Sequence, residues 1–234
     1  MFYCLLKLLM DMQKLADMQR IKVPKIVSVY SPRGTDWTAY VSAGMARELS
    51  RRNRVLLVSC SDDAAPSKYS NDFFEDLGFD EKSNLEIKTC RRDEYAPHAL
   101  QTTFGEGLGC DFVIFDAPHA LYLLPTLRII SDKFVFVIRD YAVSFSQTMQ
   151  SLEYLREDRK DVHIIVADCV DPESTRETLT KPPFSDYAAS SSIIPICREL
   201  ENEGCEKVLS DKRVKTAVQI ACEHLFGFKY SDLT

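Results

Sequence analysis

Short, continuously apolar runs recur along this chain, and they constrain its fold more than any other feature. Most of them do not alternate apolar with polar residues, which is typical of strands that are covered on both faces of a sheet. The candidate strands are Lys25–Tyr30, Arg54–Ser59, Leu85–Lys88, Phe112–Asp116, Phe134–Ile138, His163–Ala167 and Ser192–Ile196.

Helical patterns of apolar residues lie between these runs. They are Asp36–Arg52, Glu94–Gly107, Ala120–Ile130, Val143–Arg156 and Lys212–Phe226. Strand and helix in alternation predict right-handed crossovers, a mainly parallel sheet and helices on both of its faces. We therefore expect a three-layer α/β/α fold. No Ser/Gly-rich linker divides the chain, so we expect one domain over residues 25–234, preceded by a helical segment over residues 1–24.

The charge and the cysteines exclude several classes of protein. A net charge of −6 disfavours non-specific binding to nucleic acid, and we expect no nucleic-acid partner. The eight cysteines form no C-x-x-C pair, and several lie inside apolar runs, where cysteine behaves as a small buried apolar residue. The pattern indicates a reduced, cytoplasmic protein with neither a disulfide framework nor a Cys/His metal site.

The segment Met1–Arg20 has the pattern of a helix with a wide apolar face. Its apolar run is interrupted by Lys7, is too short to span a bilayer and lacks the small-residue cleavage site of a signal peptide. Three interpretations stay open. The helix packs on its own domain, it pairs with a partner or a second copy, or it lies on a membrane surface as a basic amphipathic helix.

The loop after the first candidate strand has the layout of a phosphate-binding loop. The strand ends at Tyr30, a tight loop follows, and an amphipathic helix begins near Trp37. In a parallel sheet, ligands bind beyond the carboxyl ends of the strands, which is where this loop lies.

Segments that match a known family follow one another in order from Lys25 to about Phe226. They are Ser31-Pro32 with Gly34, Met45-Ala46, Arg54–Val58, Asp111–Pro118, Ala167–Pro172 and Ile194-Pro195. On these segments the chain resembles the ParA/MinD family of deviant-Walker P-loop ATPases, of the SIMIBI class. The resemblance implies a P-loop domain, ATP and Mg²⁺ as ligands, and a dimer that closes around the nucleotide.

The P-loop segment departs from the family pattern where the family does its chemistry. Thr38 stands in place of the lysine that bridges the phosphates, and Ala39 in place of the hydroxyl residue that binds Mg²⁺. Trp37 replaces a glycine that lets backbone amides approach phosphate, and Asp36 adds a carboxylate that repels it. Ser59 and Ser61 stand where the family has two aspartates after its second strand. We therefore expect little or no ATP hydrolysis and no catalytic residue.

A helix N-terminus has free N–H groups, which a bound phosphate satisfies in the family. In this chain Asp36 or, failing that, Thr35 is predicted to cap the helix instead. The vestigial nucleotide site implied by the resemblance comprises Arg33, Gly34, Thr35, Asp36, Trp37, Thr38, Ala39, Asp116 and Asp168.

Three of these residues have two interpretations each. Asp116 either holds Mg²⁺, as the one metal-binding acid that remains, or caps the turn after its strand. Asp168 stands where the family reads the base, and it either accepts from an adenine amino group or lies at a capped strand end. Arg33 replaces the signature lysine, and it contacts either nucleotide or a carboxylate across a dimer interface.

The departures resemble those of TadZ- and CpaE-type pilus-assembly localisation proteins, which are atypical members of the family. Our leading hypothesis is a dimerising localisation or assembly factor of a pilus, secretion or cell-pole machine, located in the cytoplasm, at a pole or at the membrane periphery. One alternative is a genuine ATPase whose missing groups are supplied in trans. Another is a protein-interaction domain that holds no ligand.

Overall fold

The computed structural model describes residues 23–33, 35–60, 84–90, 109–118, 124–156, 158, 160–200 and 203–227. The strands are β1 (Lys25–Ser31), β2 (Val55–Cys60), β3 (Leu85–Cys90), β4 (Phe112–Pro118), β5 (Lys133–Arg139), β6 (Asp161–Cys169) and β7 (Ser190–Pro195). The helices are α2 (Trp37–Ser50), α5 (Leu124–Ile130), α6 (Ala142–Arg156), α7 (Pro172–Thr180), α8 (Phe184–Tyr187), α9 (Cys205–Ser210) and α10 (Lys212–Phe226), with a 3₁₀ turn at Arg198–Leu200. The predicted helices Glu94–Gly107 and Met1–Arg20, and Gly34, lie outside the described residues.

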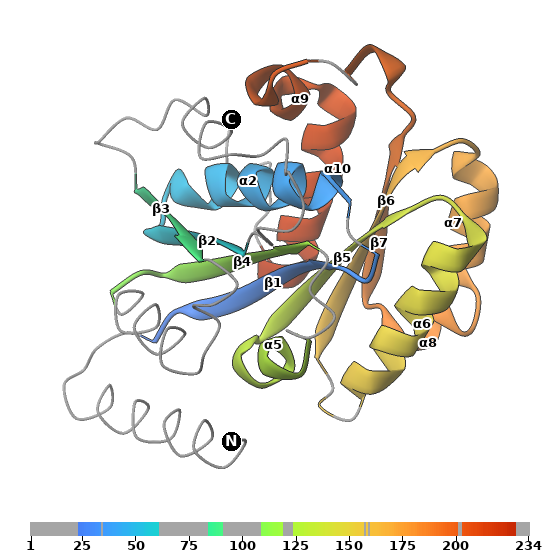
Figure 1. Cartoon of the computed structure of the whole chain (residues 1–234), viewed down its shortest axis with the longest axis horizontal. Coiled ribbons are helices and arrows are strands. Elements are labelled where there is room, and N and C mark those ends of the chain that lie inside the picture. The colour runs from blue at the N-terminus through green and yellow to red at the C-terminus, as the bar shows by residue number, and fades with distance from the viewer. Residues whose placement is uncertain are drawn as a thin grey trace.

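The seven strands form one parallel sheet in the order β3-β2-β4-β1-β5-β6-β7. Helices cover both faces, so the predicted three-layer α/β/α architecture is confirmed (Figure 1). After β1, the chain first forms β2, β3 and β4 on one side of β1, and then β5, β6 and β7 on its other side. Strand order therefore reverses at β1, and such a switch point opens a crevice at the carboxyl ends of the strands.

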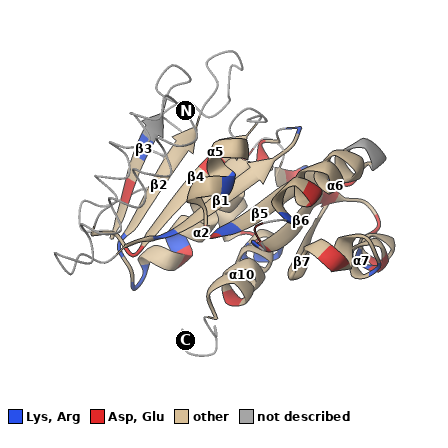
Figure 2. Ribbon diagram, turned by 90° about the horizontal axis from the view of Figure 1, so that it is seen from below, with Lys and Arg blue, Asp and Glu red and all other residues tan. Residues whose placement is uncertain are grey.

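Alternate residues of the strands face the two helical layers. In β1, Val27 and Val29 pack in a core beneath α2, α9 and α10, whereas Ile26 and Tyr30 pack in a core beneath α5, α6 and α8. Both faces are buried, which explains why the strands read as continuous apolar runs. Charged residues lie mainly on the outer helix faces, at strand ends and on β3, with both signs interspersed (Figure 2).

A buried histidine joins β6 to β7. His163 is fully buried, with Nδ1 2.6 Å from Ser190 Oγ and Nε2 2.9 Å from Ser192 Oγ. Ser192 in turn donates to the Ala217 carbonyl of α10 at 3.2 Å. Ser192 therefore accepts from the imidazole, so Nε2 carries the proton and Nδ1 accepts from Ser190.

No helix in the described part of the chain is both long enough and apolar enough to cross a membrane.

Candidate functional site

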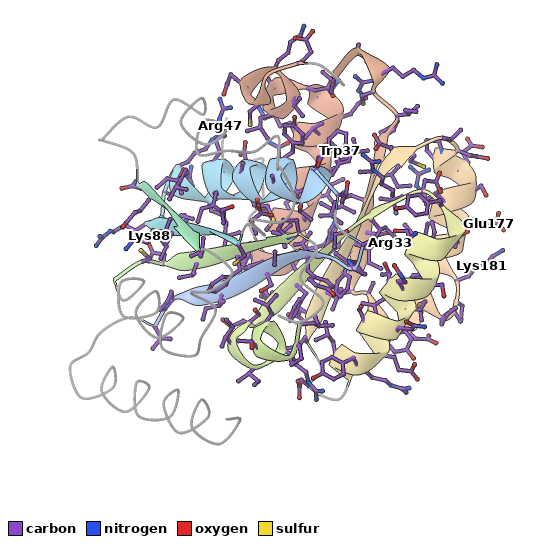
Figure 3. The ribbon with its side chains drawn as sticks, in the orientation of Figure 1. Arg33, Trp37, Arg47, Lys88, Glu177 and Lys181 are labelled. Carbon is purple, nitrogen blue, oxygen red and sulfur yellow. The ribbon has the colours of Figure 1, made fainter. Side chains whose placement is uncertain are left out.

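The loop from β1 to α2 lies at the carboxyl edge of the sheet, beside the switch point. Arg33 is exposed in this loop, and Trp37 begins the helix (Figure 3). The Trp37 indole is buried in the core beneath α2, with its ring centroid 5.6 Å from that of Tyr40. The tryptophan therefore anchors the start of the helix to the core.

Thr35, not Asp36, caps helix α2. Thr35 Oγ1 accepts from the Trp37 N–H at 3.3 Å, and the Thr35 carbonyl accepts from the Thr38 N–H at 3.1 Å. The Asp36 side chain makes no capping hydrogen bond, so the first-choice prediction is wrong and its stated fallback is correct. The reason is local: Asp36 already has helical backbone angles (φ −58°, ψ −24°), whereas a capping side chain needs an extended backbone at its own residue.

Two buried hydroxyls follow on the inner face of α2. Thr38 Oγ1 donates to the Thr35 carbonyl at 2.7 Å, and Ser42 Oγ donates to the Ala39 carbonyl at 3.0 Å. The resemblance aligns Thr38 with the phosphate-bridging lysine, and the structure shows a short, uncharged side chain here that is bonded to the loop. The methyl group of Ala39 offers no ligand to a metal.

Asp116 lies at the carboxyl end of β4, facing this stretch of α2. Its side chain is buried, and Oδ1 has no hydrogen-bond partner. Burial raises the pKa of Asp116 to about 7, and hydrogen bonds with the Ser42 and Thr38 hydroxyls limit the rise. Each hydroxyl is also within hydrogen-bond distance of a backbone carbonyl, which competes for its single proton.

Asp168 lies apart from this group. Asp116 on β4 and Asp168 on β6 are separated by three strand spacings, ~14 Å across the sheet. The Asp168 backbone is left-handed (φ 54°), and its Oδ2 lies 3.2 Å from Arg139 Nε. The cap at this edge is made by Asp171 instead, whose side chain accepts from the N–H groups of Glu173 and Ser174 at the start of α7. Asp168 thus lies at the end of its strand, paired with Arg139, while the capping carboxylate of the following helix is Asp171.

The predicted site residues thus separate into two places. Thr35, Thr38 and Asp116 come together around the start of α2 with Ser42, which was not among the predicted residues. Asp168 belongs to a second group at the ends of β5 and β6. No cluster of three or more His, Cys, Asp or Glu side chains in the described ranges is arranged to hold a metal ion.

Exposed apolar residues also lie at this edge, and sequence reasoning missed them. Tyr141, Val170 and Ile196 follow the ends of β5, β6 and β7. They are among the few large apolar side chains of the described residues that are exposed, Val170 by 75%. Hydrogen bonds join their loops: the Ile196 N–H donates to the Cys169 carbonyl at 3.0 Å, and the Val170 N–H to Asp140 Oδ2 at 3.1 Å. We call Tyr141, Val170 and Ile196 the apolar row. The sequence signal that could have identified them was their position directly after three strands that are neighbours in the sheet.

No protein-family profile matches the sequence, and no curated protein is significantly similar to it. Solved structures do match. A putative plasmid partition protein from Borrelia burgdorferi, bound to AMPPNP, is similar over 88% of this chain and 99% of its own, at 16% identity and a TM-score of 0.65.

Two further structures agree with this match. The MinD cell division protein of Aquifex aeolicus has 16% identity and a TM-score of 0.60, over 88% of this chain and 98% of its own. The ATP complex of a Cyanothece McdA variant has 11% identity and the same TM-score, over 89% of this chain and 98% of its own. Together with the seven-stranded parallel sheet, these similarities show that the chain has the fold of the ParA/MinD P-loop NTPases.

Proposed function

We propose that this protein is an atypical ParA/MinD-like protein that hydrolyses little or no ATP. It acts as a dimerising localisation or assembly factor, and recruits a protein partner of a pilus, secretion or cell-pole machine. The observation that carries the proposal is the Thr38 hydroxyl, fully buried and bonded to the Thr35 carbonyl at the position of the phosphate-bridging lysine.

The residues around the start of α2 do not fit Mg²⁺-ATP. The capping hydroxyl of Thr35 occupies the Trp37 N–H that a phosphate uses in such loops. Asp116 is shielded from solvent, and Ala39 supplies no oxygen for the metal. Arg33 is the one cationic side chain among the described residues of the loop, and it is exposed. Apart from Arg33, the described residues of this site offer no positive side chain to a triphosphate.

A specific observation favours a second function. The free Oδ1 of Asp116 is a carboxylate oxygen without a partner, as an acid that awaits Mg²⁺ would be. In this alternative the protein is a genuine ATPase, and Arg33 of a second copy supplies the missing charge. Calorimetric titration with Mg²⁺-ATP tests binding and phosphate release tests hydrolysis, and only the alternative predicts both a saturable heat and steady turnover.

Purified protein should release no phosphate from Mg²⁺-ATP above a buffer control, because both the phosphate-bridging cation and the metal hydroxyl are missing. Phosphate release measured over hours checks this prediction. The Arg33→Ala variant is the matched control, since trans catalysis would vanish in it. A turnover of about 1 s⁻¹, at the low end of ordinary enzymes, would contradict the proposal.

The protein should form a dimer without nucleotide. Multi-angle light scattering should give twice the monomer mass of 26.7 kDa. The carboxyl edge that bears Arg33 and the apolar row offers a surface for this contact, so Val170→Asp should restore the monomer, while Tyr154→Asp on α6 should not. A monomer in the wild type contradicts the prediction. A dimer that survives Val170→Asp but is lost on deleting residues 1–20 moves the contact to the N-terminal segment.

A further inference from the structure

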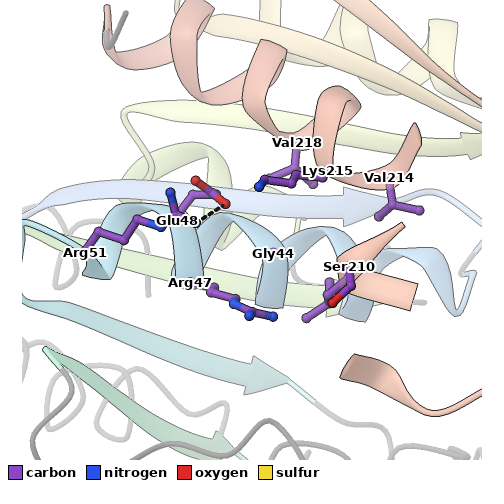
Figure 4. A pocket seen from close by; sticks show the side chains of 9 residues that line it. Gly44, Arg47, Glu48, Arg51, Ser210, Val214, Lys215 and Val218 are labelled. Atoms are coloured by element: carbon purple, nitrogen blue, oxygen red, sulfur yellow. Dashed lines mark ion pairs between the residues drawn. The ribbon is translucent and has the colours of Figure 1, made fainter. Parts of the chain in front are cut away.

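Exposed apolar surface of this protein lies at the carboxyl edge of the sheet. The pocket between α2 and the pair α9 and α10 offers a ligand little of it, because Val214 and Val218 are buried. The ion pair of Arg51 Nη2 with Glu48 Oε1, at 3.2 Å, also occupies the pocket wall (Figure 4). By contrast, three of the five large apolar side chains that are exposed among the described residues belong to the apolar row.

The apolar row has the spacing of a helix. The hydrogen bonds of the Ile196 and Val170 N–H groups hold its three loops together. Neighbouring parallel strands lie about 4.8 Å apart, so the row crosses three strands in steps of about 5 Å. One turn of an α-helix rises about 5.4 Å. A helix that lies across these strand ends therefore presents about one side chain per turn to each member of the row.

The segment Met1–Arg20 is predicted to form a helix with such a face. Leu5, Leu9 and Met12 are four and three residues apart, which places them on one side of a helix in successive turns. The same chain therefore carries an exposed apolar row and a segment whose apolar side chains have a matching spacing.

The segment and the rest of the chain have opposite net charges. Residues 1–22 carry +2, and residues 23–234 carry −8. Beside the row, Asp140 and Asp171 form no ion pair with a described residue, whereas Arg198 is an exposed cation beyond its other end. The opposite net charges attract the segment to the folded part of another copy at long range.

The amino end of β1 lies far from the row. The register pairs Val27 with Lys133, and Lys133 with Asp161. Counted along the strands, Lys25 and Cys169 are therefore ten residue steps apart, roughly 30 Å, and β1 and β6 are two strand spacings apart, ~10 Å. The chain thus enters the sheet at the edge opposite to the row.

This distance prevents the segment from covering its own row. The five residues from Arg20 to Lys25 span at most ~17 Å, and eleven residues of helix from Leu9 to Arg20 span ~17 Å. Leu9 would reach the row of its own chain only along a straight line through the folded core. A helix stretched in this way would also stand on end instead of lying across the strands. The row that the segment can cover is that of a second copy.

We propose that Met1–Arg20 of one copy lies across the apolar row of a second copy, and that the two copies exchange these segments. Both contacts are then identical, as in a two-fold dimer. The exchange presupposes the dimer proposed above, and it identifies the two surfaces in contact. Such a dimer needs no nucleotide between its copies.

Two variants of the full chain each damage one surface. Val170→Asp places a charge in the row, and Leu9→Asp places one on the apolar face of the segment. Sedimentation should show that either change weakens the dimer about 10- to 100-fold. Tyr154→Asp and Met18→Asp are the matched controls and should leave the dimer unchanged, since Met18 lies on the opposite side of the predicted helix from Leu9.

A mixture of the two damaged variants tests the exchange directly. Val170→Asp keeps an intact segment and Leu9→Asp keeps an intact row, so one of the two contacts can form between them. Sedimentation with one variant fluorescently labelled should show that they bind each other at least about tenfold more tightly than either binds itself. Recovered binding also shows that both variants are folded.

Three results would overturn the exchange while leaving the proposed dimer in place. A Leu9→Asp dimer as tight as the wild type indicates that the rows contact each other directly. A Val170→Asp dimer as tight as the wild type indicates that the segments contact each other. A mixture that binds no more tightly than the single variants places the partner surface elsewhere. A monomeric wild type would refute both the exchange and the dimer.

Discussion

Asp116→Asn should stabilise the protein, and the gain should grow as pH rises. The folded-state pKa of Asp116 is about 7, above the model-peptide value near 3.9. The protonated Asp116 side chain therefore contributes fully to the stability of the folded state below the pKa of the unfolded chain. This contribution is lost as pH rises through the pKa of the folded state. Between pH 5 and 8 the variant should gain about 2–3 kcal/mol over the wild type, because asparagine has no charge to bury.

Urea unfolding at pH 5 and pH 8, with a chelator present, measures this difference. Asp36→Asn is the matched control: Asp36 is exposed and caps nothing, so its change should stay within about 0.5 kcal/mol at both pH values. If Asp116→Asn lowers stability at pH 8, the ionised carboxylate has a partner in solution. Because the chelator removes divalent cations, that partner would be a group of the protein itself. A repeat of the measurement with Mg²⁺ in place of the chelator tests the ATPase alternative, in which the wild type gains stability and the variant does not.

The wild type should lose stability in acid through His163. Burial, and secondarily the nearby His224, lower the pKa of His163 to about 3. The unfolded chain takes up a proton near pH 6.5, whereas the folded protein resists it, so this stability is present at neutral pH and is lost as pH falls toward 3. At pH 4 the loss should reach about 3 kcal/mol.

A variant without the imidazole isolates this effect from that of the carboxylates. His163→Gln should be less stable than the wild type at pH 7, because it breaks the bridge between Ser190 and Ser192. The gap should close as pH falls to 4, because glutamine takes up no proton. His224→Gln, at an exposed position, should leave most of the wild-type pH dependence in place. A gap that stays constant with pH would show that the pKa of His163 is the same in the folded and unfolded states.

The strands were predicted well because both faces of this sheet are covered. Each predicted strand ends within two residues of the observed one, since apolar runs stop where the helical layers stop. The short helices α7, α8 and α9 were missed. α7 has few apolar residues. The only sequence signals of its start were the capping residue Asp171 and Pro172 at the first helical position.

The candidate site was harder to predict than the fold. The sequence identified Asp36 and Thr35 as candidate caps of α2. Which of the two caps the helix depends on the backbone angles of Asp36, which the sequence does not show. The pairing of Asp168 with Arg139, and the position of Ser42 beside Asp116, depend on contacts between distant segments. No local pattern carries such information. The apolar row likewise becomes visible only when β5, β6 and β7 are placed side by side.

The two outermost described strands differ in how they resist aggregation. β3 carries Glu86 and Lys88, whose side chains lie 3.5 Å apart, and charges on an edge strand oppose pairing with another chain. β7 carries three serines, two isoleucines and a final proline, without any charge. Two copies can join their sheets edge to edge during expression at high concentration or in a partly unfolded state. β7 is then the strand at which an aggregate starts to form.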